Sequence, residues 1–172
     1  MENEILRIEQ VSKEYDLKKH QKLKAVNNVS LTVRKGECVG IVGESGCGKS
    51  TLAKLITCVE PVSKGEIRFE GKDISNMKKA QRKEYYRRVQ MIFQNPSSAF
   101  SPRMRVGTFL MEPWINFAGM SRKDAWERAI EGIKSVDLDE SYMKKYPHQL
   151  SGGATKKTTS KIERTNSERK NA

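Results

Sequence analysis

The stretch Gly43-Glu44-Ser45-Gly46-Cys47-Gly48-Lys49-Ser50-Thr51 decides the fold, because it fits the pattern G-x-x-x-x-G-K-[ST] of a phosphate-binding loop. Glycines let the backbone curl until successive N–H groups point inward, and side chains at those positions would block the phosphates. Lys49 is placed to reach the β- and γ-phosphates, and Ser50 offers its hydroxyl to Mg²⁺. A helix that begins here adds the positive end of its dipole. The stretch predicts a nucleoside triphosphate site, with a glycine-rich turn as the alternative.

The residues on either side of this loop support the prediction. Glu37–Val42 is a largely apolar run, which predicts a buried strand that leads into the loop. Apolar residues follow the loop at helical spacing: Leu52, Leu55, Ile56 and Val59. Pro61 ends the helix that they predict. The local order is therefore strand, loop and helix.

Composition and charge restrict the class of protein. The 172 residues have 36% hydrophobic content, enough for one modest domain. No run of eighteen apolar residues occurs, and Met1–Glu4 lacks the basic-then-apolar design of a signal, so we expect a soluble, cytosolic chain. Cys38, Cys47 and Cys58 have neither C-x-x-C spacing nor an even count, which argues against a zinc site and a disulfide framework.

The net charge of +12 would suit a nucleic acid or an anionic membrane. Residues 154–172 carry six Lys or Arg against two Glu, and the remaining basic residues are scattered along the chain. We therefore expect a solvated basic surface, with proximity to phospholipid headgroups as the alternative.

Further elements follow from hydrophobic alternation, charge and turn residues. The expected strands are Ile5–Val11, Val29–Val33, Gly65–Ile74 with its turn, and Val89–Phe93. A polar loop, Lys13–Lys24, contains Tyr15, and Met77–Arg88 is a charged helix. The first forty residues are predicted to be antiparallel strands that deliver a parallel one.

A helical segment follows an irregular loop at Asn95–Pro102. Val106–Trp114 is apolar, and Ser121 with Asp124 three residues later predicts a capping box. The helix after it carries one apolar stripe: Trp126, Ala129, Ile130 and Ile133. Residues 103–147 are predicted to be a small helical subdomain inserted between two parts of a sheet, ended by Tyr146-Pro147.

With these motifs, the chain resembles the ATP-binding subunits of ABC transporters over about residues 4–153, and within them the ATPases of oligopeptide and dipeptide importers. Tyr15 is similar to the aromatic A-loop residue, residues 43–51 to the Walker A loop, and Gln94 to the Q-loop. Leu150-Ser151-Gly152-Gly153 is similar to the signature motif. Residues 93–104 and 146–149 resemble the peptide-importer branch.

The resemblance implies roles for these residues. Tyr15 would stack on adenine, although a loop tyrosine is often only a surface packing residue. Gln94 and Ser50 would order Mg²⁺, and Gln94 would also touch a transmembrane partner. Residues 150–153 are either a flexible turn or the signature motif. As a signature, their Ser151 would contact the γ-phosphate of ATP held by a second subunit. His148 is assigned no chemistry.

The resemblance also implies ligands and partners. ATP and Mg²⁺ are the expected cofactors. The expected partners are a second ATP-binding subunit, transmembrane permease subunits and, indirectly, an extracytoplasmic solute-binding protein. No nucleic acid is expected. The chain would sit in the cytoplasm, at the inner face of the cell membrane.

The expected fold is α/β: a P-loop NTPase of the ABC ATPase type with an antiparallel β subdomain and an inserted helical subdomain, its C-terminal core strands missing. Residues 1–102 would form the ATP-binding core, 103–153 the helical subdomain with the signature, and 154–172 a basic, disordered tail. The Walker B aspartate, catalytic glutamate and switch histidine that the family places after Gly153 have no counterpart in residues 154–172. We expect a coding sequence shifted out of frame near Ala154, or a native short protein with a basic tail.

Three functions follow. The first is the energy-coupling ATPase subunit of an importer for peptides, with nickel or another small solute as the alternative cargo. The second is a truncated or frameshifted product that at most binds nucleotide, with no catalytic residue of its own. The third, a small P-loop kinase or nucleic-acid ATPase, is disfavoured by the signature and the Gln94 loop.

Overall fold

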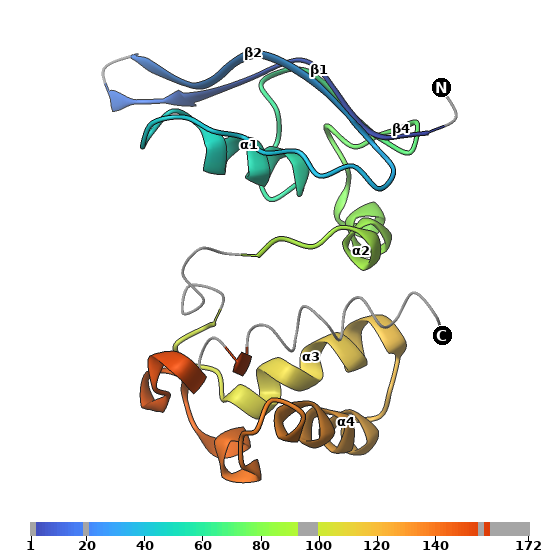
Figure 1. The fold of residues 1–172 in the computed structure, drawn as a ribbon, viewed down its shortest axis with the longest axis vertical. Coiled ribbons are helices and arrows are strands. Elements are labelled where there is room, and N and C mark those ends of the chain that lie inside the picture. Colours follow the sequence, from blue (N-terminus) through green and yellow to red (C-terminus); the bar gives the residue numbers. More distant parts are fainter. Residues whose placement is uncertain (1–2, 19–20, 93–99, 155–156, 159–172) are drawn as a thin grey trace. The chain divides into compact units, whose positions relative to one another are not determined.

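A computed structural model describes residues 3–18, 21–92, 100–154 and 157–158 of the 172-residue chain. The chain divides into two compact units, Met1–Arg82 and Lys83–Ala172 (Figure 1). The first unit contains a sheet and the second is helical. Gln94, the predicted Q-loop residue, lies outside the described residues, as does Phe93.

The sheet of the first unit has four strands, and all of its pairings are antiparallel. In chain order, the strands are β1 (Glu4–Asp16), β2 (Lys22–Arg34), β3 (Lys64–Phe69) and β4 (Lys72–Asp73). Their spatial order is β2-β1-β3-β4, so β1 is paired on both sides. The predicted antiparallel β subdomain is therefore confirmed.

The β1–β2 hairpin is longer than predicted, because β1 continues through residues predicted to form a loop. Tyr15 pairs with Leu23 and therefore lies in a strand, not in a loop. The alternation of apolar residues fades at this end of the hairpin, where Lys22 and Glu14 form a 3.5 Å ion pair. Charged side chains on both strands hid the strand pattern in the sequence.

Helix α1 (Lys49–Ile56) begins at the phosphate loop, as predicted, and lies beneath the hairpin (Figure 1). Leu52 and Leu55 are buried, whereas Val59 is 52% exposed because the helix ends before it. Buried apolar residues of this unit come from both the sheet and the helix: Ile8, Val11, Val26, Leu52, Leu55, Cys58, Ile67 and Ile74. The sheet and α1 thus share the apolar interior that holds the phosphate loop in place.

Two predicted strands are absent from the described residues. Glu37–Val42 has no strand assignment and is exposed, with Val42 at 96%. Val89–Ile92 is also irregular, with Ile92 at 70%. An extended segment becomes a sheet strand only when neighbouring strands satisfy its N–H and C=O groups, and no described segment pairs with either stretch. The expectation of a parallel strand leading into the loop was therefore wrong for this structure.

The second unit confirms the predicted helices. α2 (Lys79–Arg88) crosses the boundary between the units, and α3 (Val106–Ala118) and α4 (Arg122–Lys134) form a helical pair. The 3-10 helices η3 (Glu140–Lys144) and η4 (Pro147–Gln149) follow. Ser121 caps α4 and accepts a 3.2 Å hydrogen bond from the backbone N–H of Asp124. The predicted N-cap is confirmed, and the Asp124 carboxylate accepts a 2.8 Å hydrogen bond from the Ser121 hydroxyl.

The core of the second unit lies between α3, α4 and η3. Its buried members are Val106, Leu110, Met111, Ala125, Ala129, Ile133 and Met143. Trp126 and Ile130, from the predicted stripe, are partly buried against it. Residues 152–154 are helical, and Ala154 and Thr158 are buried. Within the described residues, no helix is both long enough and apolar enough to span a membrane.

Candidate functional site

The phosphate loop is held in shape by two glycines with left-handed backbone angles. Gly46 has φ +83° and Gly48 has φ +95°, a region that other residues rarely adopt. Gly48 is also the N-cap of α1, and a Cβ there would lie 2.1 Å from the carbonyl oxygen of Ala25 on β2. The loop therefore rests against β2 at a position where only a glycine fits.

Lys49 lies across the loop. Its ammonium donates hydrogen bonds to the carbonyl oxygens of Gly43 (2.7 Å) and Glu44 (2.6 Å), and Sγ of Cys47 lies 3.4 Å from it. These contacts place a positive charge at the mouth of the loop, beside the N-terminus of α1. A helix N-terminus and an ammonium both favour an anion there.

The remaining loop residues lie along the surface before α1 and in its first turn. Glu44, Ser45 and Cys47 are exposed along the loop, and Ser50 and Thr51 are in the first turn of α1. A cavity of about 420 Å³ adjoins the loop. Its lining comes from β2, the loop and α1: Lys24, Ala25, Val26, Asn27, Val29, Ile41, Val42, Cys47, Gly48, Lys49 and Leu52. The cavity provides space for a molecule that extends from the phosphate loop along β2.

Tyr15 lies beside the start of α1, where its phenol interacts with the hydroxyl of Thr51 and donates a hydrogen bond to Glu60. The Glu60 carboxylate raises the pKa of the Tyr15 phenol, chiefly through that bond. The structure thus brings Tyr15 close to the phosphate-loop helix. Sequence reasoning missed Glu60, since nothing in the sequence connects positions that are 45 residues apart.

The signature residues belong to the second unit. Ser151, Gly152 and Gly153 are exposed, and Leu150 packs at the edge of the helical core. The hydroxyl of Ser151 accepts a 3.3 Å hydrogen bond from the N–H of Ala154, which caps the helical turn at 152–154. Ser151 therefore lies, exposed, at the start of a helical turn. His148 stacks on Tyr146, with ring centroids 5.8 Å apart.

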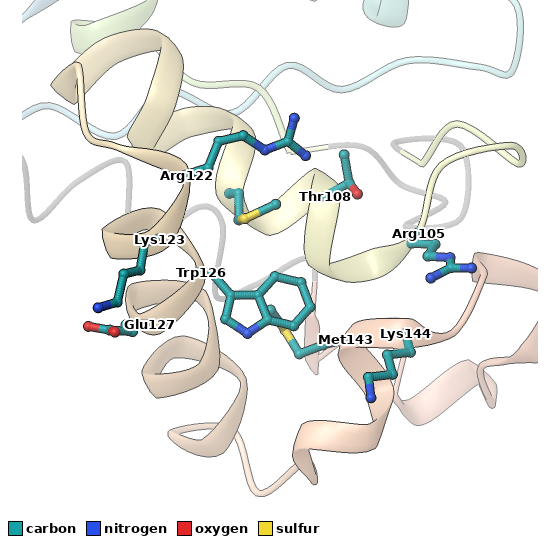
Figure 2. A pocket seen from close by; sticks show the side chains of 9 residues that line it. Arg105, Thr108, Arg122, Lys123, Trp126, Glu127, Met143 and Lys144 are labelled. Carbon is teal, nitrogen blue, oxygen red and sulfur yellow. The ribbon is translucent and has the colours of Figure 1, made fainter.

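A pocket of about 400 Å³ lies within the helical unit, between α3, α4 and η3 (Figure 2). Its lining residues are Arg105, Thr108, Met111, Arg122, Lys123, Trp126, Glu127, Met143 and Lys144. Met111 and Met143 are buried and form an apolar floor with the partly buried Trp126 indole. Figure 2 shows Arg105 and Lys144 on one side of the indole and Arg122 and Lys123 on the other. Among the described residues, none of these four cations is in an ion pair, and Glu127 is the one carboxylate in the lining, so the lining is positively charged around an apolar floor.

Comparisons with known proteins agree with this geometry. The family model described as ABC transporter matches residues 26–164. The nickel import ATP-binding protein NikE of Shigella flexneri serotype 5b is 45% identical over 135 residues, which are 78% of this chain and 50% of that protein. NikE of Escherichia coli K12 is 44% identical over the same coverage. This chain spans about half the length of these relatives.

Solved structures show the same fold. The dimeric ATP-binding cassette MJ0796, in a post-hydrolysis state bound to ADP and Pi, superposes with a TM-score of 0.79 at 26% identity. The match covers 95% of this chain and 70% of that one. The family match covers most of the sequence, and it agrees with the phosphate loop, the antiparallel sheet and the helical unit. This chain therefore belongs to the ABC transporter family, as an ATP-binding domain of the ABC ATPase fold.

Proposed function

We propose that this chain is the ATP-binding subunit of an ABC importer and that it holds MgATP in the loop 43–51. One observation carries the proposal: Gly48 lies against β2 where a Cβ would clash, and Lys49 lies across the loop mouth. These residues fit a triphosphate, because Gly48 lets the loop curl against β2 and the N-terminus of α1 and the Lys49 ammonium both favour an anion. Bound ATP would supply the energy of phosphoryl transfer.

The residues that would hold the ligand have separate tasks. Backbone N–H groups of the loop and the ammonium of Lys49 would bind the phosphates, and Ser50, with Gln94, would hold Mg²⁺. Tyr15 would stack on the base, and its hydroxyl interacts with Thr51 in the first turn of α1. The signature at Leu150–Gly153 would contact ATP bound to a second ATP-binding subunit. The similar MJ0796 cassette is dimeric, which supports that pairing.

The proposal for the transported cargo rests on the names of the relatives and on sequence motifs, not on the geometry of the nucleotide site. Proteins 45% identical to it carry the name nickel import ATP-binding protein, which favours nickel, whereas the motifs at 93–104 and 146–149 favour peptide. We propose nickel as the first cargo to test and a short peptide as the second. Uptake of each by cells that carry the complete transporter, with and without this subunit, distinguishes them.

The helical unit also contains a candidate binding site for a permease subunit. Its basic pocket, with Trp126 at the floor, would accept an acidic segment of a membrane subunit, and the chain would then lie at the cytoplasmic face of the membrane. Arg105 and Lys144 would pair with carboxylates there, and their replacement by Gln should weaken co-purification with permease subunits. Replacement of the exposed Arg128, which already pairs with Glu131 at 3.0 Å, is the control.

The proposal is tested by MgATP binding. Lys49→Ala should lower affinity about 10- to 150-fold, because it removes hydrogen bonds from a charged donor. Lys35→Ala, an exposed lysine in the turn before residue 37, should leave affinity unchanged. Equal affinity of the Lys49→Ala variant and the wild type would refute the proposal. Salt-dependent DNA binding in place of nucleotide binding would favour a nucleic-acid ATPase.

A further inference from the structure

The carboxylate of Glu60 gathers three side chains behind the phosphate-loop helix. It accepts a hydrogen bond from the Tyr15 hydroxyl, and the ammonium groups of Lys54 and Lys13 lie 3.4 and 3.8 Å from its oxygens. Only 23% of the Glu60 side chain is exposed, and only 10% of that of Lys13. A half-buried carboxylate with this many partners is fixed in position.

The cluster connects two parts of the first unit. Lys13 and Tyr15 are two residues apart on β1, and both contact Glu60. Glu60 follows the C-terminus of α1, the helix whose first turn contains Ser50 and Thr51. Lys13 also donates a 2.8 Å hydrogen bond to the carbonyl oxygen of Pro61. The contacts thus hold β1 to the segment that follows the nucleotide-binding helix.

The Tyr15 ring is held at two points. Its hydroxyl is bound to Glu60, and the Lys13 ammonium lies over the ring, 5.1 Å from the centroid. Because Lys13 lies over one face, a stacked base would have to lie against the opposite face. Because the hydroxyl is anchored, the ring cannot turn freely about its side-chain bonds. Together these two contacts fix the orientation of the Tyr15 ring.

The ionisation of both partners supports the same contact. The Glu60 carboxylate raises the pKa of the Tyr15 phenol, so the phenol keeps the proton that it donates. The bond from Tyr15 in turn lowers the pKa of Glu60, and Lys54 and Lys13 act in the same direction, so the carboxylate stays charged. Donor and acceptor each favour the form that the other requires.

We propose that Glu60 is a positioning residue for adenine recognition: its carboxylate fixes the Tyr15 ring in the orientation that stacks on the base of ATP. This inference rests on the proposed function and adds a residue that the sequence motifs do not include. It also separates two parts of nucleotide affinity. The loop and Lys49 bind the phosphates, whereas Glu60, through Tyr15, acts on the base alone.

The test compares MgATP with magnesium tripolyphosphate, which has the phosphates but no base, by calorimetric titration of the full chain. Loss of a stacked base costs about 5- to 150-fold in affinity. Since Glu60→Ala leaves the ring present but unanchored, it should weaken MgATP binding about 3- to 10-fold and leave tripolyphosphate binding unchanged. Tyr15→Phe, which keeps the ring and loses the hydroxyl, should behave in the same way.

Two further variants keep the inference falsifiable. Glu60→Gln retains an oxygen that accepts from the Tyr15 hydroxyl and should stay within about 2-fold of wild type. In a Tyr15→Ala background, Glu60→Ala should have no further effect on MgATP affinity. Equal weakening of both ligands by Glu60→Ala, or no change in either, overturns the inference while the proposed function stands. Failure of the wild-type chain to bind either ligand overturns both.

Discussion

Gly48→Ala should damage this structure more than the same change at Gly46, although both glycines have positive φ. At Gly46 the space around a new Cβ is open, so the cost is the left-handed backbone alone, about 1–2 kcal/mol. At Gly48 the Cβ would lie 2.1 Å from the Ala25 carbonyl oxygen, and the loop or β2 must also move. Such displacement adds about 1–3 kcal/mol. Gly48→Ala should therefore be the less stable variant by at least about 1 kcal/mol.

Thermal unfolding followed by far-UV circular dichroism measures this difference. For a chain of this size, 1 kcal/mol corresponds to about 2–4 °C, so Gly48→Ala should melt at least that much below Gly46→Ala. Gly71→Ala is a control outside the loop, since Gly71 also has a positive φ (+76°) and open space around it. It should lose stability as Gly46→Ala does but keep full MgATP affinity. Equal melting temperatures for the Gly46 and Gly48 variants would refute the contact with β2.

Four further predictions follow from the site and its surroundings. Ser121→Ala should lower stability by about 1 kcal/mol, read as a fall of about 2–4 °C in Tm, because the N-cap of α4 is lost; an unchanged Tm would contradict the cap. The pKa of Glu60 is lower in the folded chain than in the unfolded chain, where it is about 4.3, so ionised Glu60 stabilises the fold above that pH and loses this contribution as pH falls; the free energies of urea unfolding of the wild type and Glu60→Gln should therefore converge below about pH 4. MgATP should slow alkylation of Cys47 in the loop and leave the exposed Cys38 unchanged, as peptide mass mapping would show; equal protection of both thiols would count against the site. Phosphate release by the purified 172-residue chain should stay near the buffer background, because residues 154–172 contain no counterpart of the catalytic glutamate that the resemblance implies, and loss of a general base costs about 10²- to 10⁴-fold; robust turnover would contradict this expectation.

The parts of the fold that the sequence predicted are those that short stretches determine. The phosphate loop, the Ser121 cap and the helix from Lys49 each depend on residues within one or two turns. The pattern at 37–42 also predicted a strand, and that prediction was wrong, because a strand depends on hydrogen bonds from neighbours that are distant in sequence. Local pattern alone cannot show whether those neighbours are present.

The candidate site also combines features that one short stretch determines with contacts between residues that are distant in sequence. The loop residues lie in one continuous stretch, and their role in holding phosphate stays a prediction, whereas the Ala25 carbonyl against which Gly48 lies comes from β2. Glu60 was missed because its partner Tyr15 lies on β1, in a stretch predicted as a loop. The role of Gln94 stays a prediction, since that residue is outside the described part of the chain.

The uncovered segment before the phosphate loop has a practical consequence for anyone who handles this chain. Cys38-Val39-Gly40-Ile41-Val42 contains no charge and no proline, and its β-branched side chains lie at the surface, with Ile41 at 47% and Val42 at 96% exposure. Short uncharged segments of this kind stack into intermolecular sheets. Light scattering should therefore rise with protein concentration, and a charge introduced by Val42→Lys should suppress that rise while the loop that follows keeps its shape.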